Sequence, residues 1–336
     1  VARYDASLAT VVACEQLYKQ RQWDALLEQT RGTRQADLRL QFMTNFALCQ
    51  QGKLLDEMFR YPQSWGTRGL VLNFSGKAGL SSAEDDTSRG MYNSDLFYEM
   101  GHVNAAFRHA YNQIWAAGTT YEALERMAQC CAVNGNDALA IKYLNLLDKT
   151  LFHQRFARRY KAILADPVAA EREFGERRKR LPLVDHNMFG HPATPLLTMF
   201  ETRPDNRLAF DYLMAWMLLD KTDRALETIA VNAEHFRGAG YHSIPAHCQE
   251  AMLIREGARD TPVDLAGHHY DAAIAERVNG FLQDLSAHPD RQEALGEFRV
   301  RSRDTYLFYY FFVTPPAPQR QGMPMSGGVG GTVRVE

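Results

Sequence analysis

The chain lacks the long hydrophobic runs and the excess of one charge that mark membrane-spanning and polyanion-binding proteins. No stretch approaches the roughly 18 to 20 consecutive apolar residues that cross a bilayer, and the aromatic run at 306–313 is far shorter. The 38 basic and 40 acidic residues give a formal charge of -2. Because binding to a polyphosphate or an anionic membrane needs a concentrated positive field, the chain has no global attraction for either. Any such contact has to be local.

Paired cysteines are also missing. None of the five has the CxxC spacing of zinc or thioredoxin-like sites, and the odd count argues against a fully disulfide-bonded secreted fold. Each lies in a segment with helical periodicity, which favours a role as a small buried hydrophobe. The five are Cys14, Cys49, Cys130, Cys131 and Cys248.

Motifs that announce a reaction or a cofactor do not occur. The chain has no GxSxG elbow, no Walker A loop and no GxGxxG loop. A helical zinc pair needs histidines three or four residues apart with a glutamate at the right offset, and none of the three histidine pairs meets this. They are His186 with His191, His242 with His247, and His268 with His269. We therefore predict no catalytic residue, no metal and no cofactor.

Alanines at a constant distance from a turn are the most informative feature that is present. Ala106 and Ala140 each follow a glycine by five residues and lie 34 residues apart, the period of a tetratricopeptide-type hairpin. Ala25 follows Gln20, and Ala225 follows Asp220, by the same offset. Small side chains at such positions let two helices approach closely. The pattern predicts an all-α fold, a right-handed α/α superhelix of tetratricopeptide-like hairpins.

The first helix of each predicted hairpin also carries a small residue twelve positions before the alanine. Ser94 precedes Ala106, Ala128 precedes Ala140, and Ala13 precedes Ala25. The fourth hairpin has Leu213 at this position instead, so we expect it either to pack less closely or to follow a different register.

Breaks in the helical pattern divide the chain. We predict N-terminal hairpins over 1–184 with a long loop at 62–90, C-terminal hairpins over 185–314, and a disordered Pro- and Gly-rich tail at 315–336. A proline-containing linker at 183–204 separates the two halves. Apolar periodicity predicts helices at 5–20, 38–51, 92–100, 103–117, 121–134, 137–152, 206–219, 223–237, 245–255, 270–286 and 291–313.

The strongest positive run is Arg177, Arg178, Lys179 and Arg180, at the end of a predicted helix. Glutamates in the same segment offset it on neighbouring turns, and no aromatic residues alternate with it as binding to single-stranded nucleic acid requires. We interpret it as a solvated helix and predict no nucleic-acid partner.

In helical-hairpin repeats the first helix of each pair lines the concave face, so residues on these helices are candidates for binding a protein or peptide. The register set by the alanines selects six groove positions, which are Asp95, Glu99, Glu122, Gln129, Arg207 and Met214.

Five segments resemble an uncharacterised family, the domain of unknown function DUF6057. They are NFALCQQGKLLDEMF at 45–59, KYLNLLDKTLFHQRF at 142–156, RLAFDYLMAWMLL at 207–219, YHSIPAHCQEAML at 241–253 and DTYLFYYFFV at 304–313. The resemblance implies a helical-repeat region that follows an N-terminal membrane segment, on the extracytoplasmic face, with no family active site. Because the chain begins at Val1 and shows no such segment, we expect a processed product or a piece of a longer polypeptide.

Together these features predict a non-enzymatic protein-interaction or scaffolding module, of unknown oligomeric state, that meets a membrane only through a segment outside this chain. Two alternatives stay open. One is a hydrolase acting on glycan or peptide, with two carboxylates drawn from Glu84, Asp85, Asp86 and Asp95. The other is a domain that regulates an attached membrane enzyme or transporter.

Overall fold

The structure is a computed structural model that describes residues 6–33, 37–72, 83–184, 193–288 and 290–315. Every regular element in these residues is helical, and they contain no strand. The all-α prediction is therefore confirmed. The predicted boundary near 185 and the predicted tail from 316 onward lie outside the described residues.

The helices in chain order are α1 (Ala6–Lys19), α2 (Trp23–Thr30), α3 (Leu38–Gln50), α4 (Leu54–Glu57), η1 (Met58–Arg60), η2 (Gly66–Gly69), α5 (Ala83–Met100), α6 (Val103–Ala117), α7 (Tyr121–Val133), α8 (Asp137–Leu147), α9 (Gln154–Ala165), α10 (Pro167–Lys179), α11 (Ala193–Thr202), α12 (Arg207–Asp220), α13 (Asp223–Val231), α14 (His235–Gly238), α15 (Ala246–Arg259), α16 (Ala272–Ala287), α17 (Arg291–Ser302) and α18 (Tyr306–Phe312). The two η elements are single turns of 3-10 helix.

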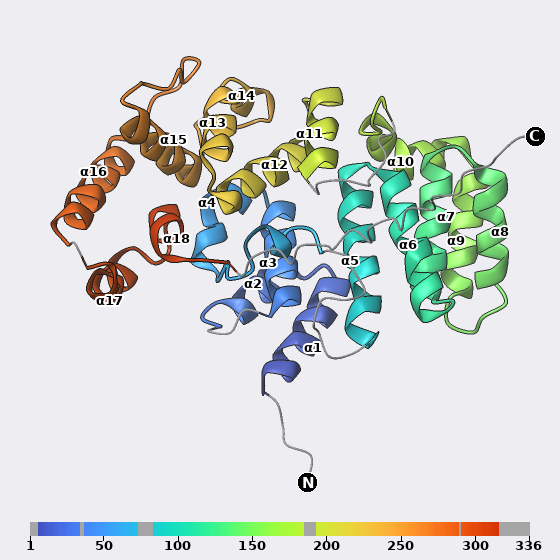
Figure 1. The fold of residues 1–336 in the computed structure, drawn as a ribbon. Coiled ribbons are helices and arrows are strands. Elements are labelled where there is room, and N and C mark those ends of the chain that lie inside the picture. The colour runs from blue at the N-terminus through green and yellow to red at the C-terminus, as the bar shows by residue number, and fades with distance from the viewer. Residues whose placement is uncertain (1–5, 34–36, 73–82, 185–192, 289, 316–336) are drawn as a thin grey trace, which may run out of the picture.

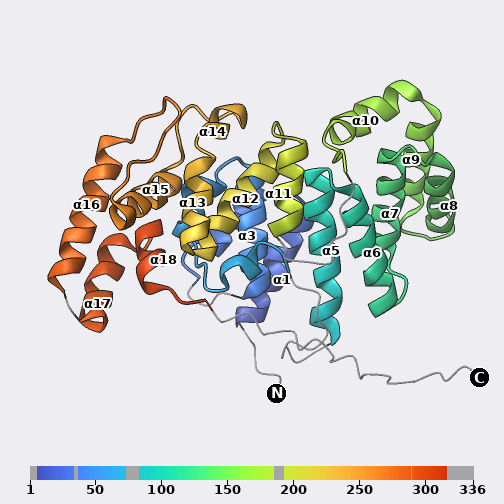
Figure 2. The ribbon, with the colours of Figure 1, turned by 45° about the horizontal axis from the view of Figure 1, so that its top comes forward.

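The helices form an elongated row whose order in space differs from their order in the chain (Figures 1 and 2). The N-terminal helices α1 to α4 lie in the middle. From there α5 to α9 stack one after another toward one end, and α12 to α18 extend toward the other. Helices pack on their neighbours in chain order from α5 to α9 and again from α11 through α12, α13 and α15 to α16. Because the row begins in its middle, the predicted superhelix that adds hairpins in chain order from one end is not confirmed.

Tight turns and side-chain caps define the hairpin of α7 and α8. Thr120 accepts a hydrogen bond from the backbone N–H of Ala123 at the start of α7. Between the helices, Gly135 adopts a left-handed conformation (φ +73°), and the side chain of Asn136 accepts from the N–H of Leu139. Glycine and an Asn cap are suited to these positions, because glycine has no Cβ to clash and the amide oxygen satisfies a free helix N–H.

Small residues do lie between the helices in three of the four predicted hairpins. Ala106, Ala140 and Ala225 have no exposed surface, and Ala128 is also buried. Ser94 Oγ donates to the carbonyl oxygen of Ala106 at 2.7 Å, so this contact is a hydrogen bond as well as a close approach.

The first hairpin departs from the predicted register, because Ala13 and Ala25 are exposed. In α6 and α8 the buried alanine is the fourth helical residue after the cap. The cap of α2 is Gln22, so its fourth residue is Leu26, which is fully buried. The turn at Arg21 (φ +56°) therefore places Leu26 where the offset rule predicted an alanine.

The C-terminal half returns to the centre of the molecule. Helix α12 packs against α3, α4 and η2, and α15 packs against α4. The side chain of Asn206, the cap of α12, donates to the carbonyl oxygen of Met100 at the end of α5. One hydrophobic core consequently runs through residues from both predicted halves.

The predicted loop at 62–90 differs from the structure at its end, because residues 83–90 belong to α5. Its other described part, 62–72, is irregular apart from η2 and packs against α3. Buried amides hold this second part: Asn45 and Gln63 exchange hydrogen bonds, and Gln41 donates to the carbonyl oxygen of Gly66 while accepting from Trp65 N–H. Polar side chains that saturate backbone groups in this way let an irregular segment lie in the interior.

Two further predictions of local structure are wrong. The proposed linker at 183–204 contains the helix α11. Pro195 does not prevent this helix, because it is the third helical residue, where the missing N–H removes no intrahelical hydrogen bond. The proposed helix at 291–313 is two helices, because the side chain of Thr305 caps a new one by accepting from the N–H of Phe308.

The close helix approach gives a test of the register. Ala140→Trp inserts a large ring where no space exists, so we expect it to lower the free energy of unfolding by about 1 to 3 kcal/mol. Ala25→Trp is the matched control, because Ala25 is exposed, and its expected effect is within about 0.5 kcal/mol. Urea denaturation measures both. Equal effects in the two variants would contradict the observed packing.

Candidate functional site

The six predicted groove residues fall in two places. Asp95 and Glu99 lie on α5, and Glu122 and Gln129 lie on the neighbouring helix α7. Arg207 and Met214 lie on α12, away from the α7 end of the row (Figure 1). The structure therefore brings residues of α5 and α7 together but does not join all six into one surface.

The residues on α5 are engaged by arginines of the same chain. Asp95 accepts a hydrogen bond from Arg126 Nη2 at 2.6 Å. Glu99 is paired with Arg21 at 2.6 Å and with Arg177 at 2.9 Å. Burial acts to raise the pKa of Glu99, but the guanidinium groups of Arg177 and Arg21 outweigh it and hold the pKa below its usual value. Glu99 is thus an ionised carboxylate inside a closed ion-pair network.

Tyr98 lies between the arginines of this network. The guanidinium groups of Arg126 and Arg177 lie 4.0 and 4.5 Å from the centre of its ring, within the range of cation–π attraction. On α7, Gln129 donates to the hydroxyl oxygen of Tyr160, which in turn donates to Glu173 of α10. These contacts bind α10 across the face formed by α5, α7 and α9.

The basic run at the end of α10 is therefore not a solvated helix face. Arg178 donates to the carbonyl oxygens of Ala132 and Val133 at the C-terminus of α7, where a cation also complements the helix dipole. Arg180 donates to the carbonyl oxygen of Glu99. Of the four basic side chains, Lys179 is the most exposed, and it pairs with Glu176 on the same helix.

The binding role of the predicted groove residues stays a prediction. The structure shows which of them are already engaged within the chain and which are exposed. Asp95, Glu99 and Gln129 already have partners within the chain. Glu122 is the exposed member, 3.7 Å from Lys19. Met214 has no exposed surface, because α12 is surrounded on nearly all sides, and so it offers nothing to a partner.

Arg207 belongs to a second polar cluster, which joins three segments. It lies 4.3 Å above the ring of Tyr241 and 3.7 Å from the carboxylate of Asp211, and it donates to the carbonyl oxygen of Gly52. Tyr241 donates to Asp211 at 2.8 Å. Gly52 (φ +68°) turns the chain close to the guanidinium, so that an added Cβ would lie 3.3 Å from it.

Burial dominates the electrostatics of this cluster. It raises the pKa of Asp211 to about 6, although the hydrogen bond from Tyr241 and the charge of Arg207 act in the opposite direction. A carboxyl group with this pKa titrates in a mildly acidic range. Sequence reasoning missed Asp211, because an aspartate within an apolar helix gives no local sign of its partners.

Three of the five segments that carry the family resemblance, 45–59, 241–253 and 304–313, meet around α18. Phe59 of the first segment contacts the rings of His247, Tyr306 and Tyr309 at 4.8 to 5.4 Å. At the start of α18, the fully buried carboxylate of Glu250 accepts from Tyr306 N–H at 2.8 Å. At its end, Lys221 Nζ donates to the carbonyl oxygens of Tyr309, Tyr310 and Val313. An anion at the N-terminus and a cation at the C-terminus both complement the helix dipole.

His247 and Glu250 form the arrangement closest to a catalytic dyad. His247 Nδ1 lies 3.4 Å from Glu250 Oε2, and its Nε2 is buried without a hydrogen-bond partner. Glu250 is also paired with Arg277 at 2.7 Å. A catalytic histidine needs a reacting group within reach of its free nitrogen, whereas this ring packs edge-on against Phe59. We interpret the dyad as part of the attachment of α18.

Metal-site and cysteine predictions can be compared with the described residues. Among these residues no group of three or more His, Cys, Asp or Glu side chains could hold a metal ion. All five cysteines are buried free thiols, as predicted. His186 and His191 lie outside the described residues.

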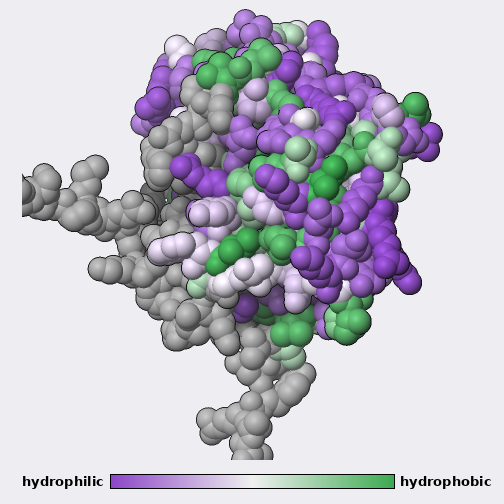
Figure 3. All heavy atoms as spheres, turned by 90° about the vertical axis from the view of Figure 1, so that its right-hand side faces the viewer, coloured by the Kyte–Doolittle hydropathy of each residue, from purple (hydrophilic) through white to green (hydrophobic). Residues whose placement is uncertain are grey.

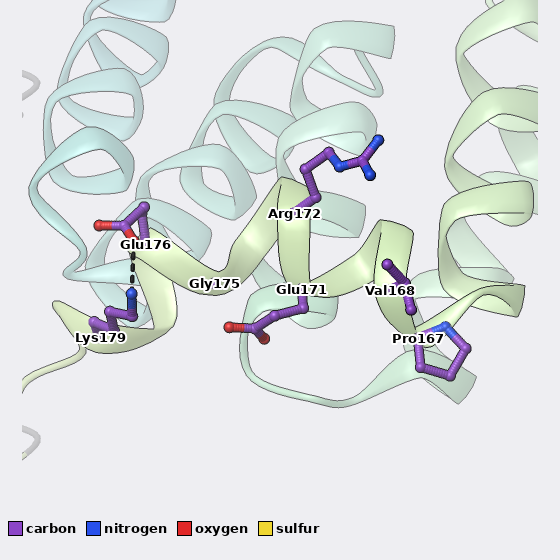
Figure 4. Close-up of a pocket in the computed structure, with 7 residues that line it drawn as sticks. All are labelled: Pro167, Val168, Glu171, Arg172, Gly175, Glu176 and Lys179. Atoms are coloured by element: carbon purple, nitrogen blue, oxygen red, sulfur yellow. Dashed lines mark hydrogen bonds and ion pairs between the residues drawn. The ribbon is translucent and has the colours of Figure 1, made fainter.

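The surface depressions in the described part of the chain are open. A depression of about 560 Å³ follows the outer face of α10. Figure 4 shows that its lining residues all come from this one helix, that Glu171 and Arg172 point in different directions, and that Glu176 pairs with Lys179. Because one helix supplies every side chain, the charged groups do not converge on a common point as they do in a ligand pocket.

Three exposed side chains and the half-buried Tyr143 on α6 and α8 form a more distinctive feature. Tyr111 and Trp115 lie one turn apart on α6 and are 54% and 83% exposed. Tyr143 of α8 lies beside the same helix, with its ring 6.3 Å from that of Phe107, and Leu146 follows one turn later. We call Tyr111, Trp115, Tyr143 and Leu146 the α6/α8 face. Figure 3, which views this end of the molecule, shows hydrophobic groups among hydrophilic ones.

Fold and surface together define a class: an all-α protein whose described helices pack into an elongated row. Comparison with known families identifies it further. The chain matches the family of unknown function DUF6057 over residues 1–313, and it belongs to that family. Comparison with curated proteins and with solved structures found no match. In the described residues, no helix has both the length and the apolar character needed to cross a bilayer.

The attachment of α18 gives a second prediction. Glu250→Ala removes the buried acceptor of Tyr306 N–H and leaves Arg277 and His247 without their partner, so we expect the free energy of unfolding to fall by about 3 to 5 kcal/mol. Glu276→Ala, at an exposed position on α16, is the control. Denaturation in urea measures the difference. A loss below about 1 kcal/mol would show that Glu250 does not hold this helix.

Asp211 gives a prediction of pH dependence. Its pKa is raised in the folded state, so the folded protein binds the proton more tightly than the unfolded chain, and stability falls as pH rises from about 4 to about 6. Asp211→Asn keeps an acceptor for Tyr241 and removes the charge. We expect this variant to lose that pH dependence and to gain about 2 to 3 kcal/mol at pH 7. Thermal unfolding between pH 4 and 8 tests it, and an unchanged slope would contradict the assignment.

Proposed function

We propose that the protein is a non-enzymatic binding module and that the α6/α8 face contacts a protein partner. The observation that carries this proposal is the exposure of Trp115 and Tyr111 on successive turns of α6, together with that of Leu146 on α8. Tryptophan and tyrosine are the residues most enriched among those that dominate the energy of protein interfaces. Isolated exposed hydrophobes are common, but an aromatic row shared by two neighbouring helices is typical of a docking surface.

The architecture supports the same proposal. Stacked helical hairpins create extended surfaces in which each helix adds a row of side chains, and such folds commonly serve recognition. The α6/α8 face lies on the second helices of its hairpins, not on the first helices that sequence reasoning selected. Helix α10 covers much of the α5/α7 side, which directs the proposal to the opposite side of the stack.

The hydrolase alternative receives less support from the described residues. It requires two carboxylates that face one pocket. Asp95 is ion-paired with Arg126, and the side chains of Glu84, Asp85 and Asp86 lie outside the described residues. A domain that regulates an attached membrane protein remains compatible with a docking surface, since the partner would then be that protein.

The proposed location is the extracytoplasmic face of a membrane, and this part rests on the family resemblance alone. Its support is the similarity of the five quoted segments, not any feature of the described helices. Protease protection of the tagged full-length protein in intact cells measures it directly, since an extracytoplasmic module is digested before the cells are lysed.

The docking proposal is tested with a double variant, Tyr111→Ser with Trp115→Ser. The purified protein is immobilised, extracts of the source cells are passed over it, and bound proteins are quantified by mass spectrometry. Because truncating a central aromatic residue typically costs 2 kcal/mol or more, we expect the partner to be depleted at least about 30-fold.

The matched control is Val231→Ser with Val300→Ser, which removes exposed apolar groups from α13 and α17. A partner retained by the wild type and the control but lost from the aromatic variant supports the proposal. The same set of proteins on all three columns would exclude the α6/α8 face as the docking site.

A further inference from the structure

The turn between α8 and α9 exposes two adjacent large apolar side chains. Leu151 and Phe152 are 87% and 89% exposed, more than any other large hydrophobic residue of the described chain. They lie in an irregular segment of six residues, 148–153, between the two helices. Figure 1 shows this segment extending from the ends of α8 and α9 at one edge of the row. We call Leu151 and Phe152 the apolar tip.

The segment behind the tip is ordered by contacts with the chain itself. Thr150 Oγ donates to the carbonyl oxygen of Leu147 and lies 3.3 Å from His153 N–H. The ring of His153 stacks 4.6 Å from that of Tyr121, and its Nδ1 lies 2.7 Å from Glu125. The exposure of the tip is thus built into a braced turn.

Basic residues flank the tip in the sequence. Lys149 precedes it, Arg155 and Arg158 follow it, and all three are exposed, Arg158 by 71%. Lys161 adds a fourth basic group; it pairs with Asp148 at 2.9 Å, which also lies 3.5 Å from Arg158, and Glu125 pairs with His153, so four basic groups stand against two acidic ones. The immediate surroundings of the tip therefore carry a local positive charge on a chain whose net charge is slightly negative.

Aromatic residues suited to an interface lie at the same end of the helices. The hairpins run back and forth, so the end of α6, the start of α7 and the turn after α8 share one edge. Trp115 and Tyr121 are exposed there, by 83% and 47%. Tryptophan and tyrosine favour the boundary between lipid and water.

We propose that this edge binds the surface of an anionic lipid bilayer, with Leu151 and Phe152 inserting among the acyl chains and Lys149, Arg155 and Arg158 contacting the lipid headgroups. Apolar burial and attraction to anionic lipid together drive peripheral binding. A protruding tip flanked by basic residues fits a fluid surface, which deforms around it, whereas a protein partner would need a pocket of matching shape. The apolar tip lies outside the α6/α8 face, although Trp115 borders both surfaces, and the proposed contact needs no membrane segment elsewhere.

The test is co-sedimentation with large unilamellar vesicles of phosphatidylcholine, with or without 30 mol% phosphatidylserine (about a third anionic lipid, a composition that gives a surface potential of several tens of millivolts). We expect binding to the anionic vesicles that weakens steeply as salt is raised and is at least about tenfold weaker on neutral vesicles. Leu151→Ser with Phe152→Ser should weaken it by at least about tenfold, because each side chain loses its apolar burial.

The basic residues that flank the tip are tested separately. Changing Lys149, Arg155 and Arg158 to Gln should weaken binding by roughly fivefold per residue. The control changes Lys53, Arg224 and Arg299 to Gln, which alters the net charge equally at exposed positions elsewhere. If both triple variants lose affinity equally, the attraction is a property of net charge and the proposed edge is wrong.

Insertion has its own measurement. In a Phe152→Trp variant, indole fluorescence should shift to shorter wavelength on anionic vesicles and be quenched by lipids brominated on the acyl chain. The proposal is overturned if wild-type protein does not sediment with anionic vesicles, if the tip variant binds as well as the wild type, or if the indole of the Phe152→Trp variant stays unquenched. Retention of a protein from cell extract through the tip, without vesicle binding, would likewise overturn it.

Discussion

The packing of α12 against α3 is the contact on which the rest of the arrangement depends. Eleven of the thirteen residues of α3 and ten of the fourteen of α12 are buried. A helix buried on nearly every side cannot lie at the edge of a row, because other elements have to cover all its faces. These two helices therefore lie in the middle, and the chain has to leave the centre, build one arm with α5 to α10, and return to build the other (Figure 2).

This constraint explains which parts of the fold could be predicted from the sequence. Helix α6 and the start of α7 were predicted correctly, because each has one apolar stripe and a clear turn at its boundary. The order of the helices in space could not be predicted, because α3 and α12 are far apart in the sequence. Their apolar character on all sides shows that each is buried, but it does not show that they pack against each other. Local periodicity identifies a buried helix but not the elements that bury it.

The candidate site shows the same limit for polar residues. Asp95 and Glu99 sit at positions that a repeat presents to a partner, and their charge predicts exposure. Asp95 pairs with Arg126 of the next hairpin, and Glu99 pairs with Arg177 of α10. An acidic residue on a helix and an arginine 78 residues later give no joint signal in a single sequence. A predicted binding groove and an internal ion-pair network therefore look alike until the helices are placed.

The apolar residues in the turn between α8 and α9 show the converse limit of prediction from sequence. Leu151 and Phe152 fall at the end of the helix predicted over 137–152. The helix instead ends at Leu147, where Thr150 Oγ donates to the carbonyl oxygen of Leu147 and Asp148 pairs with Lys161 of α9. This early end leaves Leu151 and Phe152 in a turn, as the most exposed large hydrophobic residues of the described chain. Charged residues that the sequence places on a solvated surface form ion pairs within the chain, whereas Leu151 and Phe152 are exposed to solvent. Because an exposed apolar side chain does not stabilise the fold by burial, such residues are the positions at which a binding role is best sought.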